Sequence, residues 1–136
     1  MYSTKLSVSI HILSVIALME SPPITSEYIA SSINTNPVLV RRLMSRLKKA
    51  KLVETSTKLG VMGLARKEED ITLLDIFHAV EDHPQLFNIH GDTNHKCPVG
   101  AKIESVLTRL YDNIQIATEK ELSAITLAEI TKEFII

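Results

Sequence analysis

The chain has 136 residues, with 15 Lys and Arg against 16 Asp and Glu, and one cysteine. This length fits one domain, or a small domain with an extended arm, and is enough to bury a core without disulfides. A single cysteine cannot form an internal disulfide and is compatible with a reducing compartment, so we expect a cytoplasmic protein.

The first predicted element is an apolar helix over about residues 3–20, which the Ser-Pro-Pro sequence after it should end. Four apolar residues share one face at helical spacing: Leu6, Ile10, Leu13 and Ala17. The segment is interrupted by serines and is too short to cross a bilayer, which takes about 20 apolar residues. It also lacks a cleavage site typical of signal peptides. We therefore expect a buried helix and no membrane partner.

A short second helix is expected to begin at Thr25 or Ser26, either of which can cap free backbone amides. It carries three residues toward the core: Ile29, Ala30 and Ile33. A tight turn over residues 34–36 follows. In that turn Asn36 is the predicted N-cap of a third helix, and Pro37 takes the first helical position, where its missing N–H costs nothing.

The third helix is expected to run to about Ala50 and to be amphipathic. Its apolar stripe consists of Val40, Leu43, Leu47 and Ala50. The side chains left outside that stripe are Val38, Arg41, Arg42, Ser45, Lys48 and Lys49. The helix lies in the most basic part of the chain, because residues 41–67 contain nine basic side chains and one acid. This local charge indicates a polyanionic partner, since binding responds to the local field.

A β-hairpin is predicted over residues 52–66. Residues 52–56 have β character and should form its first strand. Gly60 and Gly63 are expected to flank the bend, and residues 63–66 to return as the second strand.

The remaining elements are helical. A fourth helix opens near residues 70–72 with Thr72 and Asp75 in a capping-box arrangement. Its predicted core residues are Leu74, Phe77 and Val80. A loop over residues 84–97 with a turn at Gly91–Asp92 precedes a long helix from Pro98. A second capping box at Thr126 and Glu129 opens the last helix.

The long helix carries an apolar seam of Ile103, Val106, Leu107, Leu110, Ile114 and Ala117. This seam is long for a helix that is appended to a small domain, and it indicates contact with a partner.

A short helix, a tight turn, a basic helix and a hairpin form the order of a winged helix-turn-helix. The major groove of B-DNA admits one α-helix, while the preceding helix and the wing contact phosphates. The residues predicted to contact DNA are Thr35, Asn36, Val38, Arg41, Arg42, Ser45, Lys58 and Arg66. A charged helix face is usually only solvated, so this interpretation depends on the turn and the hairpin around it.

Three stretches together resemble the Rrf2 family of bacterial transcription regulators, especially its YwnA-like branch. They are "ITSEYIASSINTNPVLVRRLMSRLKKAKLVET", "LARKEEDITLLDIFHAVED" and "HKCPVGAKIESVL". The resemblance covers nearly the whole chain. It implies a mainly α protein with a winged helix-turn-helix domain over residues 1–82 that has a small β-hairpin wing. It also implies a loop and C-terminal dimerisation helices over residues 83–136, and a homodimer, with repression the expected outcome, on a palindromic operator in double-stranded DNA.

The chain departs from this family in three ways. Many members hold an iron–sulfur cluster with three cysteines before the long helix, whereas Cys97 is the single cysteine here, so no cofactor is expected. The wing sequence "KLGVMGLAR" is shorter than is usual in the family. Arg41 and Arg42 replace a more usual acidic residue and glutamine, so the base preference of other members does not transfer.

The sequence leaves two alternative functions open. Cys97 precedes Pro98 at a predicted helix start, where the helix dipole favours a thiolate, and is a candidate thiol sensor. Together with His90 and His95 it suggests a redox- or metal-responsive protein-interaction module, although the spacing matches no closed metal site, and no metal site is predicted. A purely structural dimerisation domain is the second alternative. An enzyme is not expected, because the sequence has no phosphate loop, nucleophile elbow or acid–base pair.

Overall fold

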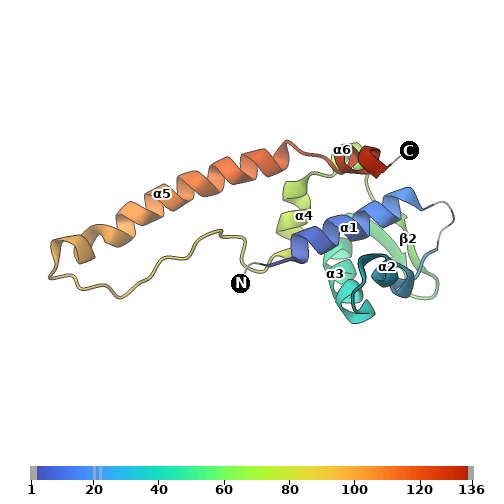
Figure 1. Ribbon diagram of the computed structural model, residues 1–136, viewed down its shortest axis with the longest axis horizontal. Helices are drawn as coiled ribbons and strands as arrows, with labels where there is room; N and C mark the ends of the chain where they lie inside the picture. Colours follow the sequence, from blue (N-terminus) through green and yellow to red (C-terminus); the bar gives the residue numbers. More distant parts are fainter. Residues whose placement is uncertain (1–2, 20, 22, 135–136) are drawn as a thin grey trace.

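The helix α1 (Lys5–Leu18) lies at the centre of the structure, a computed structural model that describes residues 3–19, 21 and 23–134 (Figure 1). It contacts four helices and one strand of the sheet: α2 (Ser26–Ile33), α3 (Pro37–Lys49), α4 (Leu73–Val80), α6 (Leu127–Thr131) and β2 (Gly60–Leu64). These elements surround a single core. The long helix α5 (Pro98–Ser123) projects away from them (Figure 1).

The predicted apolar face of α1 packs against the core, but it is not the most deeply buried side of the helix. Leu13 is fully buried, but the other three residues of that face are only partly buried. The deepest positions are instead Ser9, Ile12 and Ile16. The reason is that α1 is enclosed by neighbours on several sides, so the direction of closest packing depends on those neighbours and not on one apolar stripe. The predicted end at Glu20 lies outside the described residues.

The helices α2 and α3 begin with the predicted caps. The Thr25 side chain accepts a hydrogen bond from the backbone N–H of Tyr28, and Asn36 accepts one from Val38 at 2.8 Å. Between them Asn34 takes a left-handed conformation at φ 60° and ends α2. In α2, Ile29 and Ala30 are buried as predicted, and Ile33 is partly buried. The turn therefore sets α3 across the end of α2 as a helix-turn-helix.

The core side of α3 agrees with the prediction at three of four positions. Val40, Leu43 and Leu47 are buried, whereas Ala50 follows the helix and is partly buried. Met44 was not predicted and is 5% exposed. It widens the apolar stripe because the hairpin, and not only α1, covers this side of α3.

The hairpin consists of β1 (Val53–Ser56) and β2, paired antiparallel, with residues 57–59 at the bend. The predicted second strand over residues 63–66 is wrong, because β2 begins at Gly60 and both glycines lie within it. The physical reason is a second partner that the sequence pattern did not indicate. Ile24 and Val61 exchange two backbone hydrogen bonds of 3.1 and 2.9 Å, which extends the sheet on the other side of β2.

The helix α4 has the predicted capping box between Thr72 and Asp75. Phe77 and Val80 are buried as predicted, but Leu74 is only half-buried. Two residues that were not predicted to be in the core, Ile71 and Ile76, are fully buried there. Leu74 lies one residue after Leu73, which is four residues before Phe77 and seven before Val80 and packs against the core on their side of α4.

The last helix returns to the compact part of the molecule. Leu127 of α6 is fully buried in the common core, and its backbone N–H donates to the Ile71 carbonyl at 2.8 Å. Thr126 caps the helix by accepting from Glu129 N–H at 3.3 Å, which is one half of the predicted capping box. Two short 3-10 turns, Glu68–Asp70 and Lys132–Phe134, accompany these elements.

The arm consists of α5 and of the loop that leads into it. The loop leads outward from α4 and α5 returns beside it (Figure 1), and Gln115 joins the two by accepting from Leu86 N–H at 3.0 Å and donating to the Pro84 carbonyl at 2.8 Å. The long helix begins at Pro98 as predicted, with Cys97 at its N-cap. Asp92 in the predicted turn has φ 57°, while a further turn lies at His95–Lys96. Within the described chain, no helix combines the length and apolar character needed to cross a bilayer.

Candidate nucleic-acid interface

The outward side of α3 is polar and basic. Its exposed residues are Val38, Arg41, Arg42, Ser45, Lys48 and Lys49. This is the set that the sequence placed outside the core, so helical periodicity was sufficient to find it. Arg41 and Arg42 lie in the first turn and a half of the helix, and the end of a helix that leads into DNA is its N-terminal end.

A hollow of about 270 Å³ separates α3 from the hairpin. It is lined by Ser26, Arg41, Met44, Ser45, Lys48, Thr55, Ser56, Gly60 and Val61. Hydroxyl and cationic groups from three elements therefore meet along one edge of α3. The strand hydroxyls were missed from the sequence, because only the pairing of β1 with β2 turns them toward the helix.

Arg41 forms an ion pair with Glu27 of α2 at 3.2 Å. The two side chains are 53% and 67% exposed, so water screens the pair and it holds the guanidinium only weakly. Arg41 can therefore exchange this partner for a phosphate or a base edge. Glu27 was not among the predicted site residues, although an acidic residue in the first turn of α2 is a usable signal.

The turn residues Thr35 and Asn36 have structural roles. The Thr35 N–H donates to the Ala30 carbonyl at 3.0 Å, and the Asn36 side chain caps α3. At the other end of the interface, the Ser56 hydroxyl accepts from the N–H groups of Lys58 and Leu59, each at 3.3 Å. These bonds shape the bend of the hairpin and leave the Lys58 side chain exposed.

Two arginines of the basic stretch bind groups of the protein itself. Arg66 donates to the Ala50 carbonyl at 3.3 Å and pairs with Asp75 at 3.4 Å, so it joins the end of α3 to the start of α4. Arg46 donates to the Val80 carbonyl at 3.1 Å and to the Asp82 carboxylate. A DNA contact of Arg66 stays a prediction, and its geometry gives it a structural role as well.

The Asp82 carboxylate forms ion pairs with Arg46 and with Lys5, whose ammonium lies 3.0 Å away. The hydrogen bond from Arg46, followed by that from Lys5, lowers the pKa of the Asp82 carboxyl from 3.8 to about 2. These ion pairs therefore join α1 and α3 to the segment after α4, where the arm begins.

The candidate sensor Cys97 is exposed at the start of α5. The backbone N–H of Gly100, and then that of Val99, lower the pKa of its thiol below the ordinary value because they stabilise the thiolate. Gly100 also permits a close approach of the loop, since a Cβ there would lie 2.3 Å from the Asn94 carbonyl oxygen. A sensing role for Cys97 stays a prediction.

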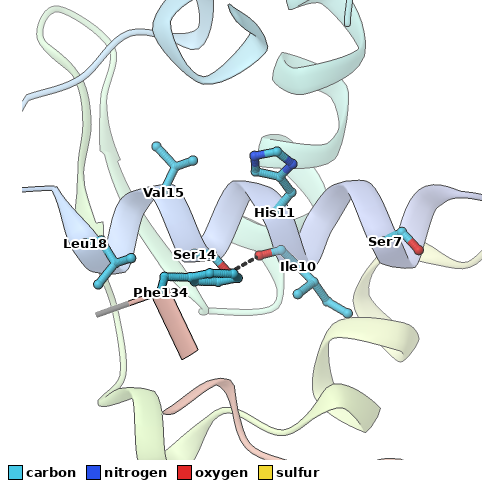
Figure 2. Close-up of a pocket in the computed structure, with 7 residues that line it drawn as sticks. All are labelled: Ser7, Ile10, His11, Ser14, Val15, Leu18 and Phe134. Atoms are coloured by element: carbon cyan, nitrogen blue, oxygen red, sulfur yellow. Dashed lines mark hydrogen bonds between the residues drawn. The ribbon is translucent and has the colours of Figure 1, made fainter. Parts of the chain in front are cut away.

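A second candidate surface lies on α1. It is an apolar groove of about 440 Å³ lined by Ser7, Ile10, His11, Ser14, Val15, Leu18 and Phe134 (Figure 2). Phe134 lies across α1 near Ser14 and Leu18, and its side chain is 55% exposed. His11 lies at the edge of this groove, where its ring Nε2 is 2.9 Å from the Ser32 hydroxyl.

Comparisons with known proteins agree with this architecture. The pattern of the Rrf2 family, described as an iron-dependent transcriptional regulator, matches residues 2–133. YwnA of Bacillus subtilis (strain 168), named as a candidate HTH-type transcriptional regulator, is 42% identical over 132 residues, or 96% of each chain. A crystal structure described as that of a candidate DNA-binding protein is 37% identical, with a TM-score of 0.74 over 93% of this chain and 97% of that one.

CymR, the global cysteine regulator of Bacillus subtilis, has a structure with a TM-score of 0.70 at 24% identity, over 97% of this chain and 96% of its own. Because the identity to CymR is low, this likeness shows the fold alone. The predicted winged helix-turn-helix fold is confirmed.

The donor set of this chain does not fit an iron centre of the cluster type. Iron–sulfur clusters are held by several cysteine thiolates, and the sequence has only Cys97. Nor do the described residues bring three or more His, Cys, Asp or Glu side chains together around a point where a metal could bind. His90 and His95 therefore give the metal-responsive alternative no geometric support in this part of the chain.

Proposed function

The chain belongs to the Rrf2 family of transcriptional regulators and is a DNA-binding transcription regulator, not an enzyme, and from this we propose that it acts as a homodimer on a palindromic operator. Each subunit inserts the start of α3 into the major groove. The observation that carries this proposal is the exposed basic side of α3, which lies beside the hairpin and includes Arg41 and Arg42.

The proposed contacts divide into two kinds. Residues at the start of α3 meet base edges and nearby phosphates: Val38, Arg41, Arg42 and Ser45. Residues of the turn and of the hairpin position the protein on the phosphate backbone: Thr35, Asn36, Lys58 and Arg66. Phosphate contacts fix the register, and base contacts carry the sequence preference.

The homodimer is supported by the arm. None of the 26 residues of α5 is buried within one chain. Its apolar residues Val106, Leu110 and Ile114 are 39 to 45% exposed. An apolar seam of this length is stabilised when a second copy covers it. The apolar groove on α1 offers a further surface to that copy. Two-fold pairing then presents two α3 helices to the two halves of a palindrome.

We also propose a division of the chain near residue 82, with the DNA-binding unit before it and the dimerisation unit after it. The return of α6 to the common core joins the last residues to the first unit in space. In this arrangement the arm projects from the compact part and supplies the main contact with a partner. The expected outcome of binding is repression, because a dimer that covers an operator excludes other proteins from it. The expected compartment is the cytoplasm, where one exposed thiol stays reduced.

A titration of operator binding against salt tests this proposal. The operator is first isolated from random duplexes by selection with the full-length protein. Arg41→Ala with Arg42→Ala should weaken binding and reduce the slope of log K against log salt by about 0.9 for each phosphate that the variant no longer neutralises. Lys102→Ala with Arg109→Ala removes the same charge from the arm and serves as the control.

Two outcomes would contradict the proposal. If the α3 variant and the arm variant have the same affinity and slope as the unaltered protein, α3 does not meet DNA. If the protein binds no duplex even at low salt, a purely structural dimerisation domain accounts for it better.

A further inference from the structure

Val38 is an exposed aliphatic residue on the proposed DNA-facing side of α3. It is the second residue of the helix, its side chain is 50% exposed, and its backbone N–H donates to the Asn36 side chain at 2.8 Å. The cap and the neighbouring Pro37 hold the first turn of α3 in place. The position of the Val38 methyl groups relative to the helix axis is therefore well defined.

The fold itself gives no reason for valine at this position. The core contacts of α3 are made by Val40, Leu43, Met44 and Leu47, which are at most 5% exposed. A β-branched residue has a slightly lower helix propensity than most residues, and exposed methyl groups add no burial energy. Polar residues occupy the positions one and two turns further along the same face, Arg41 and Ser45. Val38 is thus the apolar member of a polar surface.

We propose that Val38 is a specificity-determining residue that packs its methyl groups against the C5 methyl group of a thymine in the major groove. This inference rests on the proposed function. The thymine methyl is the one apolar group that base pairs present in the major groove, and aliphatic side chains are its usual contacts. The first residues of a recognition helix are the ones that reach base edges.

The stiffness of valine favours this contact. A β-branched side chain in a helix has one strongly preferred χ1 rotamer, so it gives up little rotamer freedom when it packs against a base. Arg41, whose ion pair with Glu27 is screened by water, remains available for a hydrogen-bonded contact nearby. The operator is accordingly expected to have a required T·A pair at one position of each half-site, next to positions read by hydrogen bonds.

Replacement of single thymines by deoxyuridine in the selected operator tests the inference. Deoxyuridine lacks the C5 methyl group and keeps the hydrogen-bonding edges. At one position per half-site, the unaltered protein should lose affinity by about fourfold, as expected for one buried carbon, and by about fifteenfold when both half-sites are changed. Val38→Ala should bind the thymine and deoxyuridine operators equally at that position, and should keep its sensitivity elsewhere.

A matched control is Leu59→Ala, which removes another exposed aliphatic side chain, 58% exposed, from the bend of the hairpin. It should leave the deoxyuridine profile unchanged, since a wing contacts the backbone and does not sense a major-groove methyl group. Circular dichroism confirms that each variant is folded. If no thymine is sensitive, or if Val38→Ala keeps the same sensitivity, the inference is overturned while the proposed function stands. If no duplex is bound at all, both fail.

Discussion

Single charged residues connect α3 to the start of the arm. Arg46 belongs to the basic stretch, yet it donates to the Val80 carbonyl and to Asp82, where α4 ends. Lys5 of α1 binds the same carboxylate. Arg46 therefore acts as a structural cation, and the number of basic residues in α3 overstates the number that are available to DNA.

The pH dependence of stability should report the Asp82 cluster. Since Arg46 and Lys5 lower the pKa of Asp82 to about 2 in the folded protein, the charged carboxylate contributes stability above pH 3.8 that is lost as the pH falls through about 2. Asp82→Asn should lower the free energy of unfolding near neutral pH, and the difference from the unaltered protein should vanish toward pH 2. Urea titrations at a series of pH values measure this.

Asp92→Asn, an exposed change in the loop, is the control and should have little effect at any pH. A deficit of Asp82→Asn that stayed constant down to pH 2 would show that its cause is not the charge.

At the scale of elements, the hairpin depends on one glycine. Gly60 begins β2 with φ 100°, and a Cβ there would lie 2.8 Å from the Ile24 carbonyl oxygen. That carbonyl accepts the Val61 N–H that joins β2 to the segment before α2. A side chain at Gly60 therefore affects both the bend of the wing and its attachment to the compact part.

Gly60→Ala should destabilise the protein by about 1–3 kcal/mol, because the new methyl group meets backbone and the φ value disfavours an L residue. Gly91→Ala is the matched control, since nothing lies within 4 Å of a Cβ at that position. It should change stability by no more than about 0.5 kcal/mol. Thermal unfolding of the two variants checks the difference, and equal losses would argue against a tight contact at Gly60.

At the scale of the whole molecule, the arm carries seven of the 13 large hydrophobic residues that are exposed in the described part of the chain. The helix α5 extends beyond the compact part (Figure 1) and has no buried residue. The loop covers only one side of it, where Phe87 packs on Tyr111 with ring centroids 5.3 Å apart. The proposed dimer places the remaining apolar seam in contact with a second copy.

Leu110→Glu with Ile114→Glu should convert the proposed dimer to a monomer and weaken operator binding, because charge on the seam cannot be buried against a partner. Sedimentation equilibrium measures the mass, and the same gel-shift titration measures the affinity. Thr108→Glu is the control: it lies two residues before Leu110, about 200° around the helix, and so faces away from the seam. A double variant that stayed dimeric would place the interface elsewhere.

What the sequence determined by itself is local. The caps at Thr25, Asn36 and Thr72 were predictable because a cap joins residues two or three apart. The polar side of α3 followed from helical periodicity, and the start of α5 from Pro98.

Only the tertiary structure decided the features that join distant residues. Arg46 and Asp82 are 36 residues apart, and Ile24 pairs with Val61 across two helices and a strand. The buried side of α1 and the return of α6 to the core likewise depend on which neighbours arrive there. No short-range pattern encodes such partners, because a side chain of given polarity is satisfied equally well by any complementary group that the fold brings within reach.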